Sequence, residues 1–300
     1  HQIIFSRLLD CIHLIKLNNS WKKHDLLSFL KTKASLMISW LHNITYKNGN
    51  IPMVNDSTFN IAPNSEKLFL YAKELGISNQ EIPLSDSGYR KITSYNYELL
   101  LDIGNVGPDY QPGHGHSDTF NFELLKNGIP IFVDTGISTY EKNNLRQRER
   151  STSSHNTVQI ENLEQTQVWD GFRVAKRAKV NILKEKYNSI KASHDGYQNK
   201  GYCHTRTYMW EEKFIIIKDE INKSTNNKSK AFFHLHSSLN KPLIKENKVI
   251  LEPLDSYITF INAASIEIDQ YQLSQGFNKT EFAFKIIVTF DKSLETKILI

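Results

Sequence analysis

Hydrophobic residues recur at helical spacing along the first part of the chain. Residues 2–17 and residues 25–43 each place isoleucine, leucine or methionine on one repeating face, as an amphipathic helix does. A third helix is predicted over residues 64–75. It is expected to stop at Gly76, because glycine readily adopts the left-handed conformation that closes a helix. The pattern therefore predicts a helical segment over residues 1–85.

The hydrophobic pattern changes to a period of two from about residue 88, which is the pattern of strands with one buried face. The segments that show it are 95–103, 119–125, 129–135, 155–160, 206–210, 214–221, 231–236, 257–261 and 282–290. Many short strands without helices between them indicate an antiparallel sandwich. The predicted fold class is α+β and multidomain, with a large antiparallel β-sandwich over residues 86–300.

One predicted hairpin carries residues suited to chemistry. Asn127-Gly128 between two apolar runs is a strong hairpin signal. His114 and His116 precede the first strand, and residues two apart in an extended chain point the same way. The return strand ends at Asp134, which the hairpin would bring back beside the histidines. Two imidazoles and a carboxylate at one end of a hairpin indicate a metal site or a proton-transfer site.

The pair of histidines is weak evidence by itself. With 11 histidines in 300 residues, a His-x-His pair arises by chance about 0.4 times, and a second pair, His234 and His236, is interpreted as structural. A further histidine, His155, opens a strand beside a loop rich in hydroxyl side chains. Together with His116 and Asp118, it also matches the two-histidine, one-carboxylate triad of iron oxygenases. That rival enzyme class stays open at this point.

Composition narrows the class of protein. The chain is 39% hydrophobic and 23% charged, which suits globular domains, and no apolar run approaches the roughly 18 residues of a membrane span. The net charge of +5 would attract a polyanion, and it fits an acidic polysaccharide as well as nucleic acid. No basic run is clustered enough to indicate nucleic acid, so a nucleic-acid partner is not predicted. Cys11 and Cys203 provide no disulfide framework and are interpreted as buried thiols.

A series of motifs follows in order along the sandwich segment: Pro112-Gly113-His114 with His116 and Asp118, then Val133-Asp134 with Gly136, then Tyr140, Arg146, Arg150 and Ser154-His155-Asn156-Thr157. This order resembles the heparinase II/III-like polysaccharide lyases, which include alginate lyases. The resemblance is dense from about residue 88 to 220 and weaker before and after. It implies that residues 1–85 are the last helix pairs of an incomplete α/α toroid, with most of the toroid absent from this chain.

The resemblance implies cleavage of a uronic-acid-containing polysaccharide by β-elimination. This reaction needs the C5 carboxylate neutralised, the C5 proton removed and the C4 oxygen protonated, which positioned acid and base groups accelerate. His114 is implied as the acid–base residue that faces the substrate. Its implied partners, a toroid tyrosine expected immediately before His1 and a toroid asparagine, are not in this chain. The chain alone is therefore expected to be inactive.

Other residues are candidates for holding the polymer. Tyr140, Arg146 and Arg150 are predicted to contact acidic sugars, because the guanidinium fork matches a carboxylate, although salt bridges within the loop are an equal alternative. Asn55 lies in a polar loop expected to line the cleft. Two aromatic residues are candidates for a sugar-stacking platform, although aromatic residues near strand ends are more often in the core: Trp169 and Phe172.

The resemblance also assigns His116, Asp134 and His155 to one divalent ion, Zn²⁺. Two imidazoles and one carboxylate leave a fourth tetrahedral position for water. The implied role of the ion is mainly structural, because it would fix the hairpin so that His114 is correctly aimed.

The predicted partners are an acidic polysaccharide or oligosaccharide and the missing N-terminal toroid portion of the same protein. The resemblance implies a periplasmic or extracellular location, although no signal peptide is visible in the chain. A non-enzyme remains a third alternative: an acidic-sugar-binding module that keeps the sandwich and the ion but has lost catalysis. The absence of the toroid acid from this chain is the reason to retain it.

Overall fold

The computed structural model describes residues 1–18, 24–84, 87–252 and 254–300. These residues form two compact units, one of residues 1–52 with 59–87 and one of residues 53–58 with 88–300. The loop 53–58, which the sequence pattern assigned to the helical segment, thus belongs to the unit that holds the strands.

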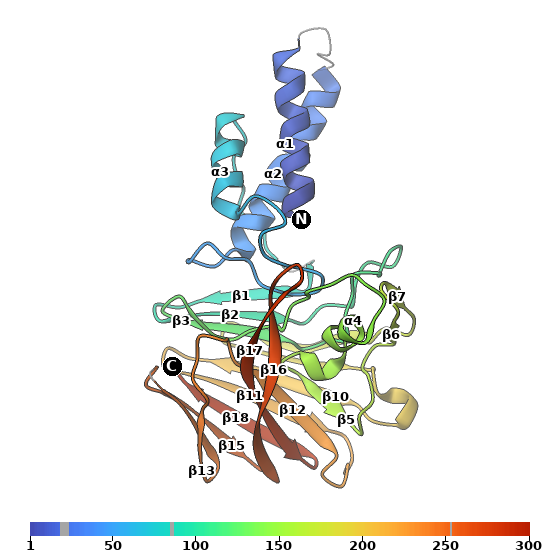
Figure 1. The fold of residues 1–300 in the computed structure, drawn as a ribbon, viewed down its shortest axis with the longest axis vertical. Helices are drawn as coiled ribbons and strands as arrows, with labels where there is room; N and C mark the ends of the chain where they lie inside the picture. The colour runs from blue at the N-terminus through green and yellow to red at the C-terminus, as the bar shows by residue number, and fades with distance from the viewer. Residues whose placement is uncertain (19–23, 85–86, 253) are drawn as a thin grey trace. The chain divides into compact units, whose positions relative to one another are not determined.

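The first unit consists of three helices, α1 (Gln2–Leu17), α2 (His24–Ile44) and α3 (Ser65–Glu74) (Figure 1). These are the three helices that the sequence pattern predicts. The side chain of Asn64 accepts a hydrogen bond from Lys67 N at the start of α3, and Gly76 follows its end with φ 71°, the cap that glycine favours.

The buried face of α1 differs from the predicted one. The predicted face consisted of Ile4, Leu8, Ile12 and Ile15. Ile12 and Ile15 are buried as predicted, but Ile4 is 67% exposed and the neighbouring Phe5 is fully buried. Cys11 is exposed and Cys203 is half-buried, so the interpretation of both as buried thiols was wrong. No helix in the described part of the chain has an apolar stretch long enough to cross a membrane.

The second unit is an antiparallel β-sandwich, as predicted (Figure 1). One four-stranded sheet has the order β1 (Tyr89–Thr93), β2 (Tyr97–Asp102), β3 (Phe122–Lys126), β4 (Ile129–Phe132). The eight-stranded sheet has the order β13 (Leu243–Lys245), β14 (Lys248–Leu251), β15 (Ser256–Ile261), β18 (Ser293–Leu299), β11 (Phe214–Ile221), β10 (His204–Trp210), β9 (Ser189–His194), β8 (Val180–Lys186). A second four-stranded sheet has the order β16 (Ser265–Gly276), β17 (Lys279–Phe290), β12 (Ser229–His234), β5 (Val158–Ile160).

Further short elements belong to this unit. β6 (Val168–Trp169) pairs with β7 (Arg173–Val174) as a separate hairpin. The helix α4 (Asn144–Glu149) lies between β4 and β5 in the chain and was not predicted from the sequence.

The predicted hairpin at Asn127-Gly128 is confirmed as β3 and β4. Both turn residues have positive φ, 50° and 78°, which is the conformation of a type I′ turn. The preceding strand is shorter than predicted, because Phe120 also has a positive φ of 68° and lies in a turn. A left-handed phenylalanine is strained, so surrounding contacts must hold it in place.

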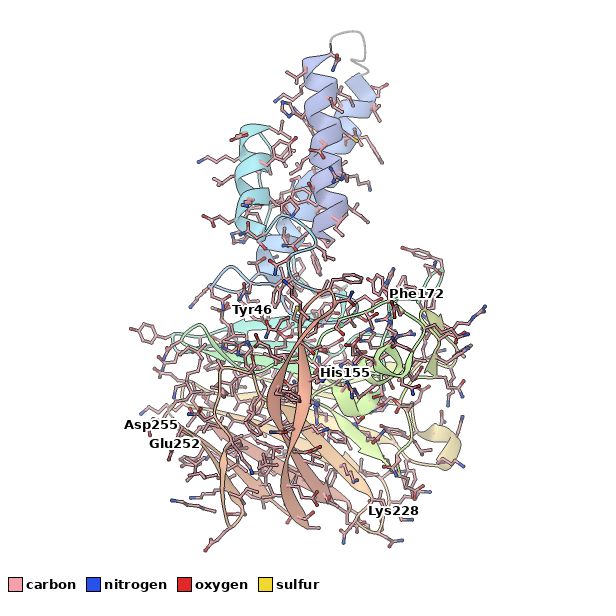
Figure 2. The ribbon with its side chains drawn as sticks, viewed as in Figure 1. Tyr46, His155, Phe172, Lys228, Glu252 and Asp255 are labelled. Atoms are coloured by element: carbon pink, nitrogen blue, oxygen red, sulfur yellow. The ribbon has the colours of Figure 1, made fainter. Side chains whose placement is uncertain are left out.

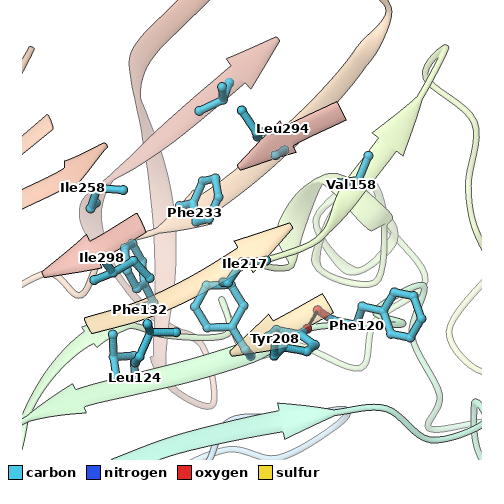
Figure 3. Close-up of a cluster of buried hydrophobic side chains, with 14 of the residues drawn as sticks. Phe120, Leu124, Phe132, Val158, Tyr208, Ile217, Phe233, Ile258, Leu294 and Ile298 are labelled. Carbon is cyan, nitrogen blue, oxygen red and sulfur yellow. Dashed lines mark hydrogen bonds between the residues drawn. The ribbon is translucent and has the colours of Figure 1, made fainter. Parts of the chain in front are cut away.

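A single hydrophobic core joins the three large sheets (Figure 3). Phe122 and Phe132 contact each other with ring centroids 5.6 Å apart, and Phe132 lies 5.8 Å from Phe233. Tyr208 and Ile217 of the eight-stranded sheet belong to the same cluster. Because this core packs all three sheets together, the loops at its edge rest on a rigid support.

Candidate functional site

His114 and His116 lie in a loop, and both contact one carboxylate. His114 Nδ1 is 2.7 Å from Asp56 Oδ2, and His116 Nε2 is 2.9 Å from Asp56 Oδ1. The prediction that the two histidines point the same way is thus correct, although the chain is not a strand here. The side chain of His114 is 64% exposed, whereas that of Asp56 is 5% exposed.

Arg146 holds Asp56 from a second direction. Its Nη1 and Nη2 donate to the two Asp56 oxygens at 2.5 and 2.8 Å, a bidentate pair. Arg146 sits on α4, where the side chain of Asn143 caps the helix by accepting from Arg146 N. Burial acts to raise the pKa of Asp56, but hydrogen bonds from His116 and Arg146 outweigh it and hold that pKa well below its usual value.

The ionised Asp56 fixes which nitrogen of each histidine carries the proton. A carboxylate only accepts hydrogen bonds, so His114 donates from Nδ1 and His116 donates from Nε2. The neutral form of the His114 ring then keeps a lone pair on Nε2, the nitrogen that does not contact Asp56. The neutral His116 ring keeps its lone pair on Nδ1, which is buried and has no hydrogen-bond partner.

His155, labelled in Figure 2, forms a second buried pair with Asp134. His155 Nδ1 lies 2.8 Å from Asp134 Oδ2, which also accepts from Asn121 Nδ2 at 2.6 Å. Burial acts to lower the pKa of His155, but the Asp134 carboxylate outweighs it and raises that pKa. His155 Nε2 is buried and unpartnered, and the rings of His116 and His155 are 5.4 Å apart.

Three buried atoms of metal-binding type in this region have no hydrogen-bond partner. His116 Nδ1, His155 Nε2 and Asp118 Oδ2 are all buried without a hydrogen-bond partner, and such a set suits a divalent ion. Within the described residues, however, no three histidine, cysteine, aspartate or glutamate side chains are gathered as a ligand set. The oxygen without a partner belongs to Asp118, whereas both oxygens of Asp134, the carboxylate expected from the sequence, already accept hydrogen bonds.

Arg146 and Arg150, predicted to contact substrate, are both fully buried. Nη2 of Arg150 donates to Gly115 O at 2.9 Å, and its Nη1 donates to Gly171 O at 3.2 Å, where Arg146 Nε also donates at 3.1 Å. Burial lowers the pKa of Arg150 to about 10, so it remains a cation at neutral pH. Their burial argues against direct contact with substrate, and their hydrogen bonds hold the loops of the site together. For Arg146, this agrees with the alternative that it forms a salt bridge within the protein.

The other two predicted substrate residues have different surroundings. Tyr140 is 42% exposed, and its ring centroid lies 6.2 Å from that of His114. Asn55 Nδ2 donates to Tyr89 Oη at 2.9 Å. Of these two, Tyr140 is the one placed against His114.

Asp56 is the residue that sequence reasoning missed. It directly follows Asn55 in a loop flagged only as polar, and it lies 58 positions before His114. No local motif connects positions so far apart, so only the fold reveals their contact.

A second buried network supports the site. Arg206 Nη1 donates to Phe120 O and Asn156 O, each at 2.8 Å, and Tyr208 Oη donates to Phe120 O at 2.6 Å. These bonds hold the left-handed Phe120. Because Asn156 is the neighbour of His155, the same arginine connects both loops that carry the candidate metal residues.

Comparison with known proteins agrees with this fold. The model of the family described as Heparinase II/III-like, C-terminal, matches residues 78–300. The structure of heparan sulfate lyase HepC from Pedobacter heparinus is similar with a TM-score of 0.69 and 18% identity, over 98% of this chain and 51% of that one. A structure of heparinase III is similar with a TM-score of 0.63 and 16% identity, over 98% of this chain and 52% of that one.

These structural likenesses show the fold, and the chain spans about half the length of those proteins. No curated protein sequence matches the chain. Apart from Asn55 and Asp56, all residues of the candidate site lie within the segment that the family model matches. The chain therefore belongs to the heparinase II/III-like family through its C-terminal domain.

Proposed function

We propose that the full-length protein is a polysaccharide lyase that cleaves a uronic-acid-containing polysaccharide by β-elimination. The observation that carries the proposal is the exposed His114 ring, held through Nδ1 by the buried pair of Asp56 and Arg146. Family membership supports lyase chemistry over the oxygenase alternative. The net charge of +5 supports a polyanionic substrate.

In this proposal His114 Nε2 is the proton-transfer atom. His114 Nε2 takes the C5 proton, and the C5–H and C4–O bonds break as the C4–C5 double bond forms. The departing C4 oxygen takes a proton from the toroid tyrosine that we propose outside this chain, and no water enters the product. Asp56 keeps the His114 lone pair aimed outward and stabilises the ring when it is protonated, as a carboxylate does for a catalytic histidine. The cation or amide that neutralises the C5 carboxylate is assigned to a residue outside this chain, because Arg146 and Arg150 are buried.

The test uses the full-length protein and alginate or heparan sulfate as substrate. An unsaturated uronate absorbs in the ultraviolet, so absorbance should rise during turnover. His114→Ala should reduce the rate by about 10²- to 10⁴-fold, since a positioned acid–base group contributes that much. Its thermal stability should stay near that of the parent, because His114 is mostly exposed.

Other outcomes separate the alternatives. Binding of uronate polymers without unsaturated product would favour the acidic-sugar-binding module. Turnover that requires iron and oxygen would favour the oxygenase. Full activity of His114→Ala would remove His114 from the mechanism.

We also propose that one divalent ion, Zn²⁺, binds here, with His116 and His155 as nitrogen ligands and a carboxylate from Asp134 or Asp118. When bound, the ion would supply a fixed positive charge that joins the two loops. The support is the pair of buried, unpartnered imidazole nitrogens. Asp134, if it is not a ligand, orients His155 as an outer carboxylate does.

Metal analysis and thermal unfolding test this proposal without any activity measurement. Saturation at about 100 times the dissociation constant stabilises a native state by about 2.7 kcal/mol, so a chelator should lower the Tm. His116→Ala should abolish this response. Comparison of Asp118→Asn with Asp134→Asn identifies the carboxylate ligand, and a metal-free protein insensitive to chelator would refute the ion.

The proposed partners are an acidic polysaccharide and the N-terminal toroid portion that would supply the tyrosine and asparagine. We propose a periplasmic or extracellular location, since polymeric substrates of this kind lie outside the cytoplasm. Fractionation of cells that express the full-length protein tests the location.

A further inference from the structure

An exposed aromatic surface lies at the tip of the hairpin formed by β6 and β7. Trp169 is 42% exposed and Phe172 is 45% exposed. Neither packs into the core, which is the opposite of the usual behaviour of aromatic residues near strand ends. Large aromatic side chains left in solvent at a defined place are characteristic of binding surfaces.

Phe172, labelled in Figure 2, has its ring next to that of the proposed acid–base residue. Its ring centroid is 5.6 Å from that of His114 and 5.1 Å from that of Tyr140. The guanidinium carbon of Arg146 lies 5.5 Å from the Phe172 ring and 5.1 Å from the Tyr140 ring. Because Arg146 is fully buried, the two rings cover it with one side and present the other to solvent.

The hairpin tip is fixed in place. Arg150 donates to carbonyl oxygens at the tip, those of Trp169, Asp170, Gly171 and Arg173, and the same guanidinium holds Gly115 O. A Cβ added at Gly113 would lie 3.1 Å from Phe172 O, so the loop that carries His114 closely approaches the hairpin. Phe172 is therefore held rigidly at its distance from His114.

We propose that Phe172 and Tyr140 form a stacking subsite for a pyranose ring of the substrate. This ring would be the neighbour of the sugar unit that reacts at His114. The C–H face of a pyranose is apolar, with weakly positive hydrogens, and it packs well on the negative face of an aromatic ring. Rigid rings bind at little cost in side-chain entropy. The exposed Arg173 on the same hairpin adds a cation for a uronate carboxylate.

The proposal rests on the proposed function for the identity of the sugar, and its test is therefore a binding measurement. The parent for the experiment is the full-length protein with His114→Ala, which holds substrate without turnover. The ligands are alginate and heparan sulfate oligosaccharides of defined length. Affinity is measured by calorimetry and by the fluorescence of the tryptophan residues, which include Trp169 on the hairpin itself.

Phe172→Leu keeps an apolar side chain over Arg146 and removes the aromatic face. It should weaken binding of the better of the two oligosaccharides about tenfold, whereas Phe172→Tyr should bind like the parent. Phe172→Ala should lose as much as Phe172→Leu. The matched control is Phe282→Ala on β17, a phenylalanine that is 72% exposed in the same unit, and it should change nothing.

The outcomes separate this subsite from the proposed reaction. Loss of affinity in Phe172→Leu with rescue in Phe172→Tyr supports the subsite even if the wild-type protein forms no unsaturated product. Unchanged affinity in Phe172→Leu overturns the subsite even if the lyase activity is present. Equal losses in Phe172→Leu and Phe282→Ala, or no binding of either oligosaccharide by the parent, also overturn it.

Discussion

The sandwich unit contains two centres, each built from one aspartate, one arginine and two histidines. The outer centre is Asp56, Arg146, His114 and His116. The inner centre is Asp219, Arg206, His194 and His204. Each has one arginine in a bidentate pair with one aspartate and two histidines around that pair, yet the two centres differ in what they leave open.

The inner centre is closed. Gly196 N donates to His194 Nδ1, so His194 donates from Nε2 to His204 Nδ1 at 3.0 Å, and His204 donates from Nε2 to Asp219 at 2.7 Å. Burial holds the pKa of His194 well below its usual value and lowers that of His204. Burial acts to raise the pKa of Asp219, but Arg206 and His204 outweigh it and lower that pKa to about 2.

The outer centre is open at two atoms. Among the described residues, the side chains of the four inner residues have no buried polar atom without a hydrogen-bond partner. In the outer centre, His116 Nδ1 is buried without a partner, and the His114 ring is exposed. A saturated buried network rigidifies a fold. A lone pair without a hydrogen-bond partner on a similar network can accept a ligand or a proton, and this difference separates the proposed functional centre from the inner one.

The largest expected effect is on stability, in the inner centre. Asp219→Ala would leave the guanidinium of Arg206 buried and unpaired, both side chains being 0% exposed, and removal of one partner of a buried ion pair costs about 3–5 kcal/mol. Chemical denaturation of the parent and the variant measures the change in the free energy of unfolding.

The control for that variant is Glu295→Ala, which removes a partly exposed pair with Lys218. An exposed ion pair contributes less than about 1 kcal/mol. Equal effects of the two substitutions would mean that the inner centre does not support the fold as its burial indicates.

The next effect is on catalysis, in the outer centre. Asp56→Asn should lower kcat of the full-length protein by about 10²-fold, equivalent to about 2.7 kcal/mol, with KM little changed. The reason is that the amide no longer fixes the proton on His114 Nδ1. Kinetics on the polymer that the wild-type protein cleaves measure the change, and nitrogen NMR of the His114 ring reports its tautomer.

The matched control here is Asp109→Asn, whose carboxylate pairs with Arg177 and is 97% exposed. It should leave kcat unchanged. Asp219→Ala, in contrast, should lower activity only in proportion to the protein that remains folded. A normal kcat of the Asp56→Asn protein would mean that Asp56, like Asp219, only supports the fold.

Much of the fold follows from local periodicity. The helices α1 to α3 and the hairpin at Asn127-Gly128 were predicted because their signals lie within short windows. Strand β8 was missed because six of its seven residues are exposed, so no alternation marks it. Within α1 the predicted face was correct at Ile12 and Ile15 and wrong near the start, where Phe5 rather than Ile4 is buried.

The candidate site was predicted only in part. His114, His116 and His155 were singled out through a motif order, and Tyr140, predicted only as a sugar contact, lies beside His114. Asp56 was missed because its contact with His114 spans 58 positions. The inner centre was missed because His194, His204 and Asp219 come from separate strands and meet only when the eight-stranded sheet forms.

The smallest expected effect is the pH dependence of stability through His194. Its pKa of 6.5 in the unfolded chain is lowered well below that value in the fold by burial, so the unfolded state binds the additional proton. The free energy of unfolding is therefore not reduced by His194 above about pH 6.5, and it falls as the pH drops below that value. Its slope from this one proton is at most about 1.4 kcal/mol per pH unit.

His194→Gln keeps a donor toward His204 and removes this titration. The free energy of unfolding of the variant should therefore fall less steeply than that of the parent between about pH 6.5 and 5, while the two curves run parallel above pH 7. Denaturation at several pH values measures both slopes. Identical slopes on the acid side would mean that His194 is protonated in the native state, which the hydrogen bond from Gly196 N to His194 Nδ1 does not permit. The inner centre would then hold a mobile proton, as the outer centre is proposed to do, and closure of the network would no longer distinguish the two.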